Sequence, residues 1–119
     1  MYTKKLLTIF FTLISILACS LLATPEPPGV GEKAELGYAA CEPIITALAK
    51  YQADTASYPE TLDELVPAYL TTLPTEVNGE SINYSKTGGE YSLSFHYVGP
   101  GMNTCTYTPK NKWQCSGAY

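Results

Sequence analysis

The residue type with the widest chemistry in this chain is cysteine, which occurs at Cys19, Cys41, Cys105 and Cys115. A thiol can pair in a disulfide, carry a lipid, bind a metal or act as a nucleophile, and its neighbours decide which. No sequence motif places a base beside Cys41, so a catalytic cysteine is not expected. Anchoring, cross-linking and packing remain, and the surrounding sequence predicts a different role for each cysteine.

A tight hairpin is predicted around residues 109–111, which form a three-residue loop between two strands. The first two of these residues suit a type I turn, and Asn111 tolerates the left-handed conformation that follows it. This register places Cys105 opposite Cys115 in a non-hydrogen-bonded pair, the type in which side chains approach most closely. A Cys105–Cys115 disulfide is therefore predicted.

Cys41 lies in a predicted helix that begins near Glu32 or Ala34 and runs to about Ala53. An apolar stripe follows one face of this helix, made of Gly37, Cys41, Ile44, Leu48 and Tyr51. The continuous stripe favours one long helix kinked at Pro43, and a helix that starts at Pro43 is the alternative. On this stripe Cys41 is expected to be a buried, unpaired thiol, and pairing with a strand cysteine is the alternative.

A short second helix is predicted after a turn at residues 57–59. Thr61 and Glu64 have the spacing of a capping box, in which each residue satisfies the backbone amide of the other. Pro67 disfavours helical backbone at Val66, so this helix is expected to end within about one turn.

From Ser81 onward the apolar pattern changes from helical to alternating, which predicts strands. Ile82 and Tyr84 share one face of a first strand, and a second strand carries Tyr91, Leu93, Phe95 and Tyr97 on one face. A turn at residues 87–89 connects these two strands. A second turn, at residues 99–101, ends the second strand and leads to a third. The last hairpin adds a fourth strand, with Tyr107 opposite Trp113.

Metal-ligand candidates are few. His96 is the only histidine, and it alternates with the apolar residues of its strand, which predicts a solvated position. A lone imidazole beside disulfide-bonded cysteines does not make a zinc site. Oxygen ligands for Ca²⁺ occur at Glu76, Asn78 and Glu80, but two carboxylates are also ordinary in a solvated loop. No metal site and no cofactor is predicted.

The ten tyrosines give the chain a high aromatic content. Tyr84, Tyr91, Tyr97 and Tyr107 fit strand faces, where packing against the sheet is expected and an aromatic platform for a glycan or peptide is the alternative. The sequence shows no catalytic triad, paired carboxylates or Gly-rich phosphate loop. The chain is therefore predicted not to be an enzyme.

The charge balance excludes nucleic acid as a partner. Seven Lys, no Arg and eleven Asp plus Glu give a net charge of −4, whereas nucleic-acid binding requires a basic surface. With 119 residues and 45% hydrophobic content, the chain has the size and composition of one globular domain.

The N-terminus has the organisation of a targeting segment, with Lys4 and Lys5 before an apolar stretch. The sequence Ile-Leu-Ala-Cys that ends at Cys19 resembles a bacterial lipobox, in which the cysteine becomes the lipidated first residue of the mature chain. This resemblance implies a lipoprotein signal peptide over residues 1–18 and a palmitate-bearing anchor on Cys19. Simple cleavage near Ala23 and retention of the stretch as a membrane anchor are the alternatives.

Residues 19–33 follow as a predicted Pro-rich tether, and residues 34–119 as a head. The prolines favour an extended, semi-stiff chain of ~3 Å per residue, which would hold the head away from a membrane.

The helix, the turn at residues 57–59, the short second helix and the exit at residues 73–74 together resemble the helix-to-head junction of type IV pilin-like proteins. Within that group, the junction most resembles that of the pseudopilins of type II secretion. The resemblance covers roughly residues 34–119 and implies an α+β fold, with the two helices packed on a four-stranded antiparallel sheet. Phe10 stands where a pilin has Gly before its cleavage site, and Ser15 where the mature pilin has Glu. Filament-type processing is therefore disfavoured.

These features predict a non-enzymatic envelope lipoprotein whose pilin-like head faces the periplasm or the cell surface and serves in binding or assembly. The expected partners are the membrane, reached through the lipid anchor, and a protein of the cell envelope. The alternatives are a minor pseudopilin of a type II secretion or type IV pilus system, and a small glycan- or peptide-binding module.

Overall fold

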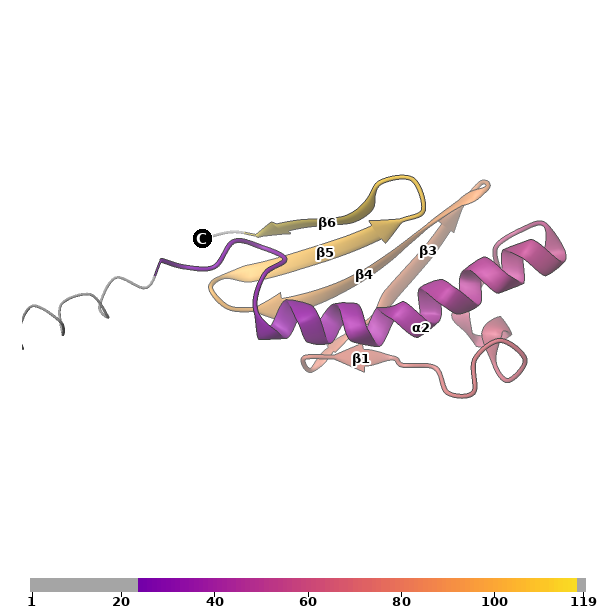
Figure 1. The fold of residues 1–119 in the computed structure, drawn as a ribbon, viewed down its shortest axis with the longest axis horizontal. Helices are drawn as coiled ribbons and strands as arrows, with labels where there is room; N and C mark the ends of the chain where they lie inside the picture. The colour runs from indigo at the N-terminus through magenta and orange to yellow at the C-terminus, as the bar shows by residue number, and fades with distance from the viewer. Residues whose placement is uncertain (1–23, 118–119) are drawn as a thin grey trace, which may run out of the picture.

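The computed structural model describes residues 24–117, in which one long helix packs against one face of an antiparallel sheet (Figure 1). The predicted signal peptide and Cys19 lie outside the described residues. The described part of the chain is α+β, as expected, with a sheet of four antiparallel strands and a second, two-stranded one.

The long helix α2 spans Glu32–Thr55, and the 3-10 helix η2 follows at Leu62–Leu65. A small hairpin comes next, formed by β1 (Glu76–Val77) and β2 (Glu80–Ser81). The main sheet has the strand order β3-β4-β5-β6, with β3 at Asn83–Thr87, β4 at Glu90–Val98, β5 at Met102–Thr108 and β6 at Lys112–Gly117.

Helix α2 is continuous through Pro43, so the prediction of one long helix is confirmed and a helix starting at Pro43 is wrong. Its buried face carries Ala34, Gly37, Cys41, Ile44, Ala47 and Leu48, which includes most of the predicted stripe. The helix begins at Glu32, one of the two predicted starts, and includes the last two residues of the segment predicted as a tether. It ends where Ala56 adopts a left-handed conformation and donates its N–H to the Gln52 carbonyl at 2.9 Å.

The core lies between this helix face and the inner face of the sheet. Tyr91, Leu93, Phe95 and Tyr97 alternate along β4 and are all buried. On β5, Cys105 is buried among them. Leu65 closes the core from η2, where the Thr61 N–H donates to Glu64 Oε2 at 2.9 Å as the predicted capping box requires.

The predicted register of the last hairpin is confirmed. Cys105 pairs with Cys115, and Tyr107 pairs with Trp113. The left-handed residue, however, is Lys112 with φ 59° and not Asn111. The Asn111 N–H donates to Thr108 Oγ1 at 3.1 Å, which keeps Asn111 within the turn and moves the reversal one residue later.

The hairpin of β1 and β2 was not predicted. Asn78 and Gly79 form its turn with φ values of 56° and 78°, the positive pair that two-residue hairpins require. The first strand of the main sheet also begins later than predicted, at Asn83. Ile82 lies outside it because its N–H donates to the Thr75 carbonyl at 2.8 Å.

Candidate functional site

The tyrosines of the sheet pack inward and do not form an exposed aromatic platform. Tyr91 and Tyr97 are only 4% and 2% exposed. Tyr84 donates its hydroxyl to the Pro59 carbonyl at 2.7 Å, and burial raises its pKa to about 12. Burial also raises the pKa of Tyr91. The packing role expected for these side chains is confirmed, because Tyr91 and Tyr97 are buried and Tyr84 and Tyr107 pack against the core.

The opposite side of the sheet presents a different surface, which we call the outer face. It comprises the side chains of β3 to β6 that alternate with the buried ones. These are Asn83, Ser85, Thr87, Glu90, Ser92, Ser94, His96, Val98, Met102, Thr104, Thr106, Thr108, Lys112, Gln114 and Ser116. Eight of these fifteen are serine or threonine. The two charged members, Glu90 and Lys112, both lie beside turns at the edge of the face.

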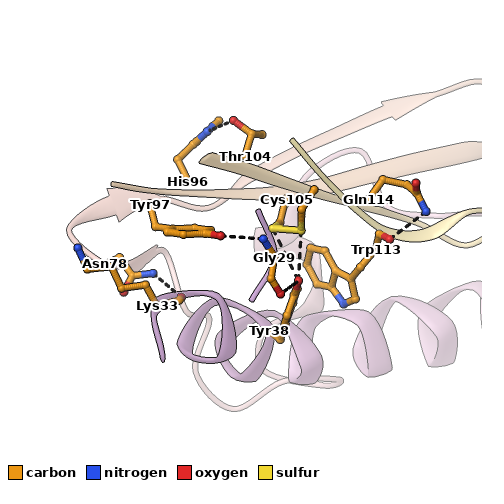
Figure 2. The surroundings of a disulfide bond; sticks show 11 residues. Gly29, Lys33, Tyr38, Asn78, His96, Tyr97, Thr104, Cys105, Trp113 and Gln114 are labelled. Carbon is orange, nitrogen blue, oxygen red and sulfur yellow. Dashed lines mark hydrogen bonds between the residues drawn. A yellow bond between two sulfur atoms is a disulfide. The ribbon is translucent and has the colours of Figure 1, made fainter. Parts of the chain in front are cut away.

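His96 lies on this outer face, on the side of the sheet away from Tyr97 and Tyr38 (Figure 2). Its Nδ1 is 2.9 Å from Oγ1 of Thr104, its cross-strand partner, and the two share a hydrogen bond. That bond fixes the orientation of the ring and leaves Nε2 for another partner. The predicted solvated side is correct, although the side chain is half-buried among its neighbours.

Two shallow clefts lie toward the ends of the outer face. The His96 cleft has a volume of about 200 Å³ and is lined by Glu80, His96, Tyr97, Val98 and Met102. The Ser92 cleft has a volume of about 190 Å³ and is lined by Ser85, Thr87, Glu90, Tyr91, Ser92 and Thr108. Between the clefts, Ser94 of β4 stands beside its cross-strand partner Thr106.

A second organised region joins the N-terminal segment to the head. Figure 2 shows Gly29 held between Tyr97 and Tyr38. The Gly29 N–H donates to the Tyr97 hydroxyl at 2.8 Å, and the Tyr38 hydroxyl donates to the Gly29 carbonyl at 2.9 Å. Gly29 has φ 87° and lies so close to Cys115 that an added Cβ would stand 2.8 Å from its Sγ. We call this arrangement the tether joint.

The disulfide forms one wall of the tether joint. Cys105 Sγ and Cys115 Sγ are bonded at 2.02 Å, and the Tyr38 hydroxyl lies 3.2 Å from Cys115 Sγ. Trp113 packs on the other side of Tyr38, with ring centroids 4.9 Å apart. The cross-link therefore fixes both the last hairpin and the surface on which the N-terminal segment rests.

Cys41 is buried in the helix–sheet core, and the part of the chain that the structure describes contains no disulfide partner for it. Burial raises the pKa of its thiol to about 12, so the neutral form persists at physiological pH. A protonated, buried thiol is suited to packing.

Of the predicted calcium-ligand candidates on the β1–β2 hairpin, Asn78 is used within the fold. Asn78 Nδ2 donates to the Lys33 carbonyl at 2.8 Å, which fastens the turn to the start of α2. Across residues 24–117, no three His, Cys, Asp or Glu side chains gather closely enough to hold a metal ion. Within the same range, no helix has the length and apolarity needed to cross a membrane.

Neither the tether joint nor the outer face was predicted from the sequence. For the outer face a pattern existed, because Thr104, Thr106 and Thr108 alternate along one strand, as do Ser92 and Ser94. For Gly29 there was none, since its partner Tyr97 is 68 residues away. No protein-family model, no curated protein and no solved structure matches this chain.

Proposed function

We propose that this chain is a non-enzymatic lipoprotein of the bacterial cell envelope, anchored through Cys19, whose head serves in binding or assembly. The lipobox-like sequence at residues 16–19 supports the anchor. The observation that carries the role of the head is the tether joint, because it gives the anchored chain a fixed point of entry.

A fixed entry point determines which end of the head is joined to the anchor. At ~3 Å per residue, the chain from Cys19 to Gly29 would span at most about 30 Å. Gly29 then meets the head beside β6, and an added Cβ on Gly117 would stand 3.2 Å from Pro28 Cγ. The end of α2 and the η2 region lie at the other end of the head (Figure 1). In an anchored protein built in this way, the Gly29 end of the head would be the end joined to the membrane.

Several features of the head favour binding or assembly over catalysis. The Cys41 thiol is buried with a raised pKa, and the Tyr91 and Tyr97 rings are part of the core. The outer face presents a set of short hydroxyls, which suit hydrogen bonding to a partner.

A minor pseudopilin is the second candidate, and the arrangement of the fold favours it. A long helix packed along an antiparallel meander of four strands is the architecture that the pilin-like resemblance implies. Phe10 and Ser15 at the leader argue against pilin-type processing, so this candidate ranks behind the lipoprotein.

Replacing Cys19 tests the anchor. The full chain carrying Cys19→Ser, expressed in a bacterium fed labelled palmitate, is expected to accumulate as an unprocessed precursor without label. Cys41→Ser is the matched control, because it removes a thiol within the head and should leave labelling unchanged. If Cys19→Ser is cleaved and exported as the wild type is, the lipoprotein proposal is wrong.

A further inference from the structure

We infer that the outer face of the sheet binds an uncharged glycan chain, which lies along β4 between the His96 cleft and the Ser92 cleft. This inference deepens the proposed binding role by naming the class of ligand.

The outer face carries little charge, as does the chain as a whole, in which 15% of the residues are charged. Antiparallel sheets commonly expose one polar face. Here two of the fifteen outer-face residues carry a formal charge, and both lie beside turns. The middle of the face is therefore polar and uncharged, which matches a ligand of the same character.

The hydroxyls form a regular array. Neighbouring strands are ~4.8 Å apart, and alternate residues along a strand are ~7 Å apart. Serine and threonine side chains at neighbouring positions of the outer face are therefore separated by about these distances. The run from Ser92 to Val98 is about 20 Å long at 3.3–3.4 Å per residue. Because each hydroxyl both donates and accepts a hydrogen bond, such an array complements a polymer that presents hydroxyls along its length.

The His96 cleft supplies the more directional contacts. The imidazole is oriented by Thr104, and Glu80 contributes a carboxylate that accepts hydrogen bonds from sugar hydroxyls. Val98 and Met102, which are cross-strand partners, are 56% and 66% exposed. These two side chains offer an apolar surface to the C–H face of a sugar ring.

Other classes of ligand fit this face less well. An extended peptide adds to the free edge of a sheet through its backbone, whereas the hydroxyl array of the outer face consists of side chains, and residues 103–107 of β5 are already paired with both neighbouring strands. A lipid surface would have to desolvate the hydroxyls without replacing their hydrogen bonds. Anionic polymers would be repelled by this acidic chain, which has no Arg to bind their charged groups.

The test measures binding of neutral hexasaccharides to the full-length chain purified in detergent. The two probes are a hexasaccharide of β-linked glucose and one of β-linked N-acetylglucosamine, and titration calorimetry gives their Kd. For at least one probe we expect saturable binding with amide NMR shifts centred on β4 and β5. Absence of binding to both, or shifts centred on α2, would overturn the inference.

Two variants assign the binding to this face. Thr106→Lys places an ammonium in the middle of the uncharged array and should weaken binding at least about tenfold, because the charge must lose water against a neutral ligand. Thr46→Lys makes the same change on the exposed side of α2 and should leave Kd unchanged. If Thr106→Lys does not fold, the double variant Ser94→Ala, Thr106→Ala replaces it, with an expected loss of roughly fivefold or more.

Equal affinities for the wild type and the outer-face variant would contradict the inference. Lipidation of Cys19 is measured separately, so failure of glycan binding leaves the anchor proposal standing, and failure of lipidation leaves glycan binding untouched.

Discussion

Gly37 of helix α2 lies directly against the ring of Phe95 on β4, so closely that a methyl group at Gly37 would overlap the ring atoms. The absence of a side chain at this position lets the helix approach the sheet. The next residue, Tyr38, then meets Phe95 edge-on with ring centroids 5.5 Å apart. This contact therefore sets the distance between the core layers and the position of the tether joint.

Gly37→Ala is expected to destabilise the head. Alanine is the better helix former by about 1 kcal/mol, but overpacking a filled core costs about 1–3 kcal/mol. Because the added Cβ would overlap the ring carbons of Phe95, we expect the upper end of that cost and a net loss of about 2 kcal/mol in the free energy of unfolding. Denaturant titration measures it. Gly89→Ala is the control, because an added Cβ there meets nothing within 4 Å. A Gly37→Ala protein as stable as the wild type would contradict the close contact.

Gly29→Ala tests the tether joint against a control with similar backbone strain. Gly29 and Gly88 have φ values of 87° and 62°, so alanine is strained at both, but only at Gly29 does the added Cβ also meet Cys115 and Tyr38. We expect Gly29→Ala to cost at least about 1 kcal/mol more than Gly88→Ala. We also expect faster protease cleavage near residues 24–31. Equal losses for the two variants would show that the joint adds no stability.

The disulfide closes a short loop, and its removal should cost about 2–3 kcal/mol by the loop-closure estimate. The double variant Cys105→Ser, Cys115→Ser should melt at a lower temperature and still fold, because the helix–sheet core remains. Peptide mapping without reductant should recover a cross-linked peptide joining the two strands. A cross-link from Cys41 to either strand would contradict the pairing.

The head should lose stability in alkaline solution. Burial raises the pKa of the Cys41 thiol from its ordinary value of 9.0 to about 12, so above pH 9 the unfolded chain releases this proton while the folded chain retains it. This contribution is fully present below pH 9 and is lost as the pH rises to about 12. Tyr84, with its pKa raised to about 12, acts in the same direction.

Urea titrations at a series of pH values measure this slope. Cys41→Ala removes the thiol, so its free energy of unfolding should fall less steeply with pH than that of the wild type, even though its stability near neutral pH is lower. Parallel slopes for the two proteins would show that Cys41 titrates alike in the folded and unfolded states.

Local chemistry explains what could be predicted from the sequence. The last hairpin depends on its own turn residues and on the alternation of its strands, so the register of Cys105 and Cys115 followed from a few neighbouring residues. The capping box at Thr61 was equally local. The Asn-Gly turn of the β1–β2 hairpin is visible in the sequence. Its strands of two residues are too short to show alternation, so the hairpin was not predicted.

The tether joint depends on contacts that no local pattern records. Gly29 bonds to Tyr97 across 68 residues, and its place is determined by how α2 and β4 pack. The outer face likewise becomes a surface only when four strands are aligned, because each strand alone shows an ordinary polar alternation. In both cases the sequence contained the residues, and tertiary packing determined their relation.

The proposed envelope role depends on a lipid on Cys19, which mass spectrometry of the mature N-terminus detects. We expect the mature chain to begin at Cys19 and to carry the mass of a diacylglyceryl group on that residue. A mature chain that begins at another residue, such as Phe11 after pilin-type cleavage, or one that begins at Cys19 without lipid, would contradict the proposal.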